Sequence, residues 1–551
     1  MKPDFIIEVS WDICNNQSEI SKSIASKSRF MHDKNCLLIG PYFPNNNDFS
    51  SKPLPQGFFP AFDELRKLGI VCYFGSSYGC RAILIDFSKL MHQKNKIKGD
   101  LWEWFKVDSL HSTKDFEEKA VFGYAAGILV EKILPSYNYE KGVLQCYDWK
   151  SCSCLLYAKA KKLKIAKIYT SYSTVLGKAL AELGIDNIEP DKEAYKLNIE
   201  SKHQMEKEAV INSDLFTAIS ESVALEARNI LGAKAAVILQ QGLDFESYPR
   251  LDELSVKSNL SRSRLKEFVN YYFFPYYQFS LSETSFILIV SDSDGIEKTV
   301  KALSMLNKKL NKSKKTVIAF FFMPVFSKGI KSSVIDNKKQ YLNLRSFIEE
   351  NEEDFKNEII ESVIAKKSST RQLLSLIAAA RERPFHKDGN PPICINYLEY
   401  EANILNIFKK NSLLNRKQDN VKIVYSNDRQ NDFLNFEEIV SGFDLGIFAS
   451  AYEPIIFKPL ETMALGIPVI TTDRGFGRHQ KNLGHTIIPF NKEFSGRLFS
   501  HINSLIGKSG NDRIKLKVEA KNKAREYDWK NLFGNYAKSY ELAIQKAPPN
   551  K

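Results

Sequence analysis

Two glutamates, Glu453 and Glu461, stand eight positions apart in SAYEPIIFKPLETMALGIPVITTDRGFG, residues 450–477. One carboxylate can stabilise positive charge that develops on a reacting carbon, and another can fix hydroxyl groups by accepting their hydrogen bonds. A helix that starts between them, beside Lys458, would attract a phosphate group. These residue types fit transfer of a sugar from a nucleotide diphosphate, although the spacing alone also fits a solvated pair of glutamates.

Local signals predict a strand, a loop and a short helix around these glutamates. The apolar run LGIFAS, residues 445–450, has the composition of a buried strand, and Pro459 suits the first turn of a helix because its missing N–H costs nothing there. Gly466 followed by Pro468 would end that helix before the strand PVITT. Because α/β sheets bind ligands beyond the carboxyl ends of their strands, the loop and helix lie where a ligand is expected.

The chain of 551 residues is too long for one hydrophobic core. Strand-like apolar runs alternate with amphipathic helical stretches, which is typical of sheets covered by helices. We therefore predict an α/β protein with two doubly wound Rossmann-like domains facing across a cleft. The domains are residues 1–275 and 276–520, the latter with projecting helices at 335–383, and residues 521–551 form a helix that returns to the first domain.

The predicted strands of the first domain are apolar runs bounded by turn residues, namely residues 36–41, 69–75, 82–87, 142–148, 165–172, 215–220 and 235–242. The first predicted strand of the second domain begins near residue 284 with TSFILIVSDSDG and enters a turn, and the last predicted strand is PVITT. The aromatic segment FVNYYFFPYYQF, residues 268–279, is predicted to be the hinge.

Composition disfavours several other classes of protein. The start does not resemble a secretory leader, and no stretch approaches about eighteen uncharged apolar residues, so we expect a cytoplasmic protein with no membrane partner. Cys146, Cys152 and Cys154 have no fourth ligand at metal spacing, which disfavours a zinc site. The net charge of +13 permits binding to a polyanion, but the lysines are scattered among acidic residues, so no nucleic acid partner is expected.

Residues 450–477 resemble the donor-site motif of the glycogen synthase family, of the animal, fungal and Bacteroidetes-like kind. That motif reads approximately Y-E-P-W-G-Y-T-P-x-E, followed by G-x-P-x-I-T-T and G-F-G. The similarity extends to FIIEVSWDICN near the start, to DKEAYKLNIESKHQMEKEAVINS in the middle and to DWKNLFGNYAKSYELA near the end. It implies a GT-B fold and a retaining transfer of glucose, without a metal, from UDP-glucose or ADP-glucose to the non-reducing end of an α-1,4-glucan.

The resemblance also implies roles for residues at matching positions. Glu453 would stabilise charge at the donor glucose, and Asp148 and Tyr172 would line the glucose side. The nucleotide side would be formed by Glu461 at the ribose and by Lys458, Lys178, Gly475 and Gly477. The first domain would be the acceptor side and the second the nucleotide-sugar side. A glycogen-like α-glucan and a homo-oligomer are the implied partners, and no cofactor is implied besides the sugar nucleotide.

The chain departs from the family pattern where the donor phosphates are held. The family follows its opening strand with a Lys or Arg, a small residue and two glycines, whereas this chain has NNQSEI, residues 15–20. IVSDSDGIEK replaces the family's G-R and N-K-G, so Asp292 and Asp294 stand in place of two cations. A carboxylate and a phosphate about 4 Å apart repel each other by about 1–4 kcal/mol.

Two interpretations follow. In the first, the chain is a glycogen or starch synthase-type glucosyltransferase of weak or altered activity, and Lys458 and Lys178 partly replace the lost cations. In the second, it is a catalytically inactive homologue that binds glucan as a regulatory or scaffold subunit. Calorimetry separates them, because the inactive homologue would bind malto-oligosaccharides without binding UDP or ADP.

Overall fold

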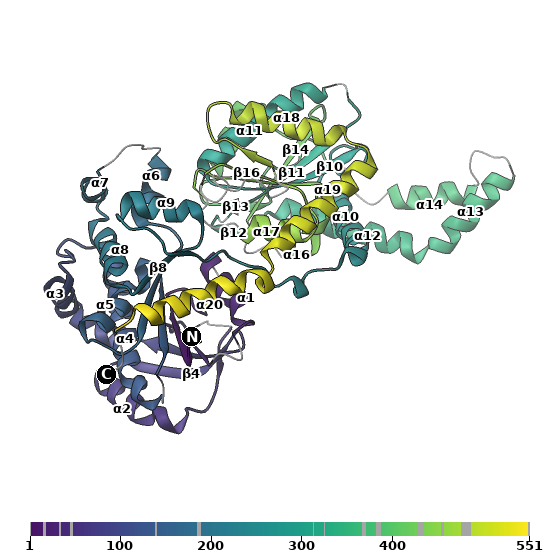
Figure 1. The fold of residues 1–551 in the computed structure, drawn as a ribbon. Helices are drawn as coiled ribbons and strands as arrows, with labels where there is room; N and C mark the ends of the chain where they lie inside the picture. The colour runs from purple at the N-terminus through teal and green to yellow at the C-terminus, as the bar shows by residue number, and fades with distance from the viewer. Residues whose placement is uncertain are drawn as a thin grey trace.

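A computed structural model describes residues 2–14, 18–31, 35–44, 48–137, 140–183, 189–311, 313–323, 325–365, 371–381, 387–427, 435–452, 457–474 and 486–548. Among these residues the strands form a nine-stranded sheet, a six-stranded sheet and a separate two-stranded pair. The two large sheets lie in separate lobes, each covered by helices, as the alternating sequence pattern predicts (Figure 1). We call the lobes of the nine-stranded and six-stranded sheets the first and second domains.

The first sheet has the strand order β3-β4-β5-β2-β1-β6-β7-β8-β9. Its strands from β5 to β9 in this order pair in parallel. The elements of the N-terminal half of the chain are β1 (Phe5–Val9), α1 (Glu19–Ser28), β2 (Cys36–Pro41), β3 (Ser50–Ser51), α2 (Phe59–Lys67), β4 (Val71–Ser77), β5 (Cys80–Asp86), α3 (Lys94–Phe105), α4 (Lys114–Ile133), β6 (Gly142–Tyr147), α5 (Cys152–Ala160), β7 (Ala166–Ser171), α6 (Val175–Leu183), α7 (Pro190–Lys196), α8 (Glu200–Asn212), β8 (Leu215–Ala218), α9 (Glu221–Ile230), β9 (Val237–Ile238) and α10 (Leu251–Tyr272).

One edge of the first sheet differs from the parallel arrangement that the alternating pattern predicts. β4 pairs antiparallel with β5, and β3 pairs antiparallel with β4. The two-residue turn between β4 and β5 consists of Tyr78 and Gly79, whose φ angles are +50° and +79°. Positive φ at both central residues is what a tight hairpin turn requires, so this pair of strands closes without a crossover helix.

The second sheet has the strand order β14-β11-β10-β15-β16-β17, and all its pairs are parallel. β17 was not predicted, because three residues are too few to show a periodic pattern. The elements of the C-terminal half of the chain are β10 (Thr284–Ser291), α11 (Ser293–Leu310), β11 (Thr316–Met323), β12 (Ser327–Ile330), α12 (Ser332–Glu350), α13 (Glu352–Ile364), α14 (Arg371–Arg381), β13 (Asn396–Leu398), α15 (Glu401–Lys410), β14 (Val421–Asn427), α16 (Phe436–Ile439), β15 (Leu445–Ala449), α17 (Phe457–Ala464), β16 (Val469–Thr472), β17 (Thr486–Ile488), α18 (Phe494–Gly507), α19 (Gly510–Ala524) and α20 (Trp529–Lys546).

The long insertion without strands is helical. Figure 1 shows α13 and α14 extending away from both lobes, while α12 starts against the second domain. Arg345 on α12 pairs with Glu267 on α10 at 3.0 Å. The insertion thus forms an arm that is attached through α12.

The last helix returns to the first domain, as predicted. α20 lies along the lobe of the first sheet in Figure 1, although α19 before it covers the second domain. The indole N–H of Trp529 donates to Ser26 Oγ at 2.6 Å, and the hydroxyl of Tyr536 donates to the carbonyl of Leu239 at 3.3 Å. Trp529 and Tyr536 are both buried, so α20 is part of the first domain's core.

The aromatic segment predicted as a hinge packs on the second sheet. The rings of Phe268 on α10 and Phe320 on β11 have centroids 5.5 Å apart, and the Tyr277 hydroxyl donates to the carbonyl of Asn415 at 2.5 Å. Its role as a hinge and the boundary at residue 275 stay predictions. Within the described residues, none of the helices combines the length and apolar character that a bilayer span requires.

Candidate functional site

Five of the eight predicted site residues lie in the part of the chain that the structure describes. Asp148 and Tyr172 directly follow β6 and β7, at the carboxyl edge of the first sheet. Lys458 and Glu461 lie on α17 of the second domain, and Lys178 is exposed on α6. Glu453, Gly475 and Gly477 fall outside the described residues.

Asp148 is held in an unusual backbone conformation beside Tyr172. Its φ and ψ are 55° and 172°, a region that non-glycine residues rarely adopt and that is concentrated at functional sites. Its Oδ1 accepts the backbone N–H of Tyr172 at 2.8 Å, and only 6% of Asp148 is exposed. Burial raises the pKa of this carboxyl to about 7, because the charged form loses its hydration. The Tyr172 hydroxyl donates to Ser23 Oγ at 3.1 Å and is buried.

Three carboxylates accept backbone N–H groups from one turn, residues 172–175, between β7 and α6. The pairs are Asp148 with Tyr172 (2.8 Å), Glu226 with Thr174 (2.8 Å) and Glu206 with Val175 (3.0 Å). Negative charge is favourable at the start of a helix, where N–H groups lack partners within the helix. Burial raises the pKa of both glutamates above its usual range. Three elements of the first domain therefore fix the turn that carries Tyr172.

Replacement of Asp148 by asparagine is expected to change how stability depends on pH. The carboxyl has a raised pKa, so between pH about 4 and 7 the folded chain binds a proton that the unfolded chain has lost, and stability falls as pH rises by up to about 1.4 kcal/mol per pH unit. The asparagine side chain still offers an oxygen to the Tyr172 N–H and does not titrate. Urea unfolding at pH 5 and pH 8 should show the variant gaining stability over the wild type at pH 8. An equal difference in stability between the variant and the wild type at pH 5 and pH 8 would contradict a raised pKa at Asp148.

The segment Ser450–Tyr452, which leads into Glu453, is held at each of its residues by a different element. The contacts are Thr472 Oγ1 to the Ser450 carbonyl (2.8 Å), the Ala451 N–H to Asp292 Oδ2 (2.5 Å) and the Tyr452 hydroxyl to Glu226 Oε1 (3.0 Å). The first two partners stand at the ends of β16 and β10 of the same domain, whereas the third comes from α9 of the first domain. Glu226 also accepts the N–H of Thr174 in the turn after β7, so the carboxyl ends of both sheets lie close to this segment.

Asp292 has a second contact that the sequence comparison did not predict. Its Oδ1 accepts the N–H of Gly295 at 2.7 Å, so it is the N-cap of α11. A Cβ at Gly295 would lie 1.7 Å from the carbonyl oxygen of Ala449, so only glycine lets α11 approach the end of β15 this closely. The carboxylate therefore occupies the start of α11, where a helix would otherwise attract a phosphate.

Cationic groups also lie near this edge. Lys298 on α11 places Nζ 3.6 Å from the ring centroid of Phe490. The N–H of Phe490 donates to Asp473 Oδ1 at 2.7 Å, which ties it to the turn that carries Arg474. Burial lowers the pKa of Lys298, and the positive charge of Arg474 acts in the same direction. Lys298 and Arg474 are thus neighbours on adjacent elements, and neither was predicted.

On α17, Glu461 and Lys458 are partly buried. The hydroxyl of Tyr248 lies 3.4 Å from Glu461 Oε1, a long hydrogen bond that joins α17 to the segment before α10. α17 begins at Phe457 and ends at Ala464, before Gly466 with φ of +78°, as the Pro459 and Gly466 signals predict.

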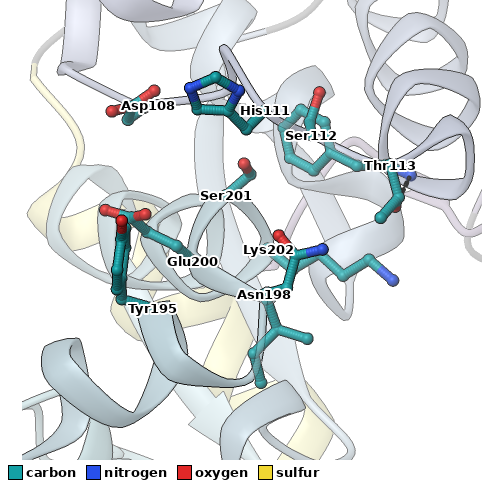
Figure 2. A pocket seen from close by; sticks show the side chains of 11 residues that line it. Asp108, His111, Ser112, Thr113, Tyr195, Asn198, Glu200, Ser201 and Lys202 are labelled. Carbon is teal, nitrogen blue, oxygen red and sulfur yellow. Dashed lines mark hydrogen bonds between the residues drawn. The ribbon is translucent and has the colours of Figure 1, made fainter.

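A separate pocket of about 120 Å³ lies in the first domain (Figure 2). It lies between the segment that precedes α4 and the start of α8, and His111, Ser201 and Lys202 are among its lining residues. None of the predicted site residues lines it. The structure therefore separates this pocket from the site at the sheet edges.

Sequence reasoning missed Glu206 and Glu226, because single glutamates within polar helical stretches are typical of solvated helix faces. The N-cap role of Asp292 had an available signal, since aspartate is a preferred cap directly before a helix. Tyr452 stands in the quoted motif, but a contact between residues 226 positions apart leaves no local pattern.

Comparison with known proteins connects this geometry to a family. A family model described as glycogen synthase matches residues 8–551. The liver glycogen [starch] synthase of Mus musculus is 24% identical over 600 residues, covering 99% of this chain and 84% of that protein. The glycogen [starch] synthase of Dictyostelium discoideum is 26% identical over 593 residues, covering 99% of this chain and 67% of that protein.

The fold is similar to solved GT-B glycosyltransferases. The catalytic domain of starch synthase IV from Arabidopsis thaliana, bound to ADP and acarbose, superposes with a TM-score of 0.56 at 11% identity, covering 99% of this chain and 100% of that chain. Identity this low shows the fold alone, and it confirms the predicted GT-B architecture. Because the family match spans nearly the whole sequence and the fold agrees with it, this chain belongs to the glycogen synthase family.

Proposed function

We propose that this chain transfers glucose from a nucleotide diphosphate to the non-reducing end of an α-1,4-glucan, with retention of configuration. The observation that carries the proposal is the meeting of both sheets' carboxyl ends at Ser450–Tyr452, directly before Glu453. Family membership supports a nucleotide-sugar donor and a glycogen-like acceptor. UDP-glucose and ADP-glucose are the candidate donors.

In this proposal, Glu453 stabilises the positive charge that develops on the donor carbon as the diphosphate leaves. Asp148 and Tyr172 form the glucose side, and the raised pKa of Asp148 allows it to act as a hydrogen-bond donor or acceptor near neutral pH. Glu461 accepts hydrogen bonds from the ribose hydroxyls. The remaining residues of the nucleotide side are Lys458, Lys178, Gly475 and Gly477.

The donor diphosphate would meet a mixed set of charges. Asp292 carries a negative charge at the start of α11 and opposes phosphate binding there. Lys458 and the start of α17 attract the phosphates, and Lys298 and Arg474 are further cations at the same edge. This balance supports a donor site that binds its nucleotide weakly, and hence transfer that is slow or altered in nucleotide preference.

A transfer assay tests the proposal. The purified chain is incubated with glycogen and either radiolabelled UDP-glucose or radiolabelled ADP-glucose, and label in the polysaccharide is counted. Incorporation from one donor, released again by an α-1,4-specific glucosidase, is the expected result. If neither donor gives incorporation while malto-oligosaccharides still bind, the second function is supported: a non-catalytic, glucan-binding regulatory or scaffold subunit.

The predicted homo-oligomer is proposed to form through the arm of α12–α14. Its described surface exposes several large apolar side chains, namely Ile335, Leu342, Ile348, Ile359, Ile360, Val363, Ile364 and Leu374. Val363 and Ile364 are 71% and 75% exposed, which is costly for adjacent apolar residues unless another surface covers them. Replacing both by aspartate is expected to lower the oligomeric mass measured by analytical ultracentrifugation. A wild-type protein that sediments as a monomer would contradict the proposal.

A further inference from the structure

We propose that the hydrogen bond between Tyr452 and Glu226 joins the two domains and positions the segment before Glu453 for reaction. Glu226 is thereby a positioning residue, because it acts through Tyr452 and not on the sugar. The inference rests on the proposed function, to which it adds a link between domain arrangement and the reacting carboxylate.

On the first-domain side, the Glu226 carboxylate is itself rigidly held. Its Oε1 accepts the backbone N–H of Thr174 at 2.8 Å and the hydroxyl of Thr174 at 2.7 Å. Thr174 Oγ1 in turn accepts the N–H of Gly177 at 2.9 Å in the first turn of α6. A Cβ at Gly177 would lie 2.3 Å from Glu226 Cδ, so the absence of a side chain there makes room for the carboxylate. Contacts within the first domain therefore hold the Glu226 carboxylate, in addition to the bond from Tyr452.

On the second-domain side, Tyr452 ends a segment that its own domain also restrains. Thr472 holds Ser450 and Asp292 holds Ala451, both within the second domain, so Tyr452 is the residue of this segment that bonds outside its own domain. The Tyr452 hydroxyl reaches Glu226 Oε1 at 3.0 Å, across the domain boundary. Glu453 is the next residue in the chain. The proposed link from Tyr452 to Glu453 therefore rests on the single peptide bond that joins them in the sequence.

The bond is coupled to domain arrangement because its partners belong to different domains. Tyr452 follows β15 of the second domain, and Glu226 lies on α9 of the first. Rotation of one domain away from the other would separate the two oxygens and release Tyr452. Hydrogen bonds to charged acceptors are among the stronger ones, so the contact favours the joined arrangement. The same side chains would be mispositioned when the domains are apart.

Three variants test the proposal in the transfer assay. Tyr452→Phe removes only the hydroxyl and is expected to lower kcat by about tenfold or more, with a smaller effect on KM for the donor. Glu226→Ala should lower kcat similarly, and the double variant should lose no more than Glu226→Ala alone. Glu226→Gln keeps an acceptor oxygen and should restore most of the activity. Tyr124→Phe, which removes a hydroxyl that donates to Asp100 Oδ2 at 2.7 Å within the first domain, is the matched control and should leave kcat unchanged.

Hydrogen exchange gives a second readout that does not depend on catalysis. Tyr452→Phe is expected to speed exchange in residues 172–177 of the first domain as well as in residues 449–452 of the second, whereas Tyr124→Phe should not. Unchanged exchange in residues 172–177 overturns the proposal, even if kcat falls. If the wild type shows no transfer at all, the proposed function fails, and the exchange result still decides whether the interdomain hydrogen bond exists.

Discussion

Replacement of Glu453 by alanine is expected to lower glucosyl transfer by at least about a hundredfold, because loss of a group that stabilises transition-state charge typically costs that much or more. The donor carbon gains positive charge as the diphosphate leaves, and the proposal assigns no other carboxylate to that carbon. Binding of the nucleotide relies on other groups, so KM for the donor should change far less than kcat. Initial rates of label transfer to glycogen at several donor concentrations measure both constants.

Two comparisons keep this result interpretable. Glu189→Ala removes an exposed glutamate on the surface of the first domain, whose partner is the exposed Lys192, and should leave the rate unchanged. The thermal midpoint of Glu453→Ala should match that of the wild type within a few degrees. Full activity in Glu453→Ala would show that the Glu453 carboxylate is not needed for the transfer.

Replacement of Lys27 by methionine is expected to destabilise the fold by about 3–5 kcal/mol, the usual cost of removing one partner of a buried ion pair. Lys27 and Glu8 are 2% and 0% exposed, and Lys27 Nζ lies 2.6 Å from Glu8 Oε1. The same ammonium donates to the Tyr147 hydroxyl and lies 4.9 Å from the ring centroid of Tyr536 on α20. The methionine side chain is unbranched and of similar length to that of lysine, but it leaves the carboxylate of Glu8 without its cation. Urea unfolding followed by circular dichroism measures the loss.

The design includes a rescue and a surface control. Adding Glu8→Gln to Lys27→Met removes the uncompensated charge and should recover much of the lost stability. Lys530→Met breaks the exposed pair between Lys530 and Glu246, whose side chains are 61% and 77% exposed, and should cost less than about 1 kcal/mol. Equal losses for Lys27→Met and Lys530→Met would contradict the view that the buried pair connects α1, β1 and α20.

The sequence was sufficient for the architecture because the parallel strands are buried on both faces. β6 and β11, for example, are buried at every residue and therefore show as largely apolar runs, interrupted by Gln145 in β6 and beginning with Thr316 in β11. The same logic could not reveal the antiparallel edge, which depends on the conformation of Tyr78 and Gly79. It could not reveal β17 either, because that strand is only three residues long.

The site was predictable only in part. Asp148 and Tyr172 were proposed because they end two predicted strands and occupy positions that correspond to conserved family blocks, and the structure places the Tyr172 N–H on the Asp148 carboxylate. Their role at the donor glucose stays a proposal. Glu206 and Glu226 were not found, because their partners come from distant parts of the chain and their charge is satisfied by backbone N–H groups. Asp292 is a further example. The sequence gives its charge but does not reveal the two backbone N–H groups from which it accepts hydrogen bonds.

Isothermal titration calorimetry of the wild-type chain with UDP and with ADP tests most directly whether the site binds a nucleotide diphosphate despite the negative charge of Asp292. We predict binding heat with at least one of the two nucleotides, with an affinity that falls as salt is raised, because cations such as Lys458, Lys298 and Arg474 would supply the attraction. Absence of heat with both nucleotides, in a preparation that still binds malto-oligosaccharides, would contradict it.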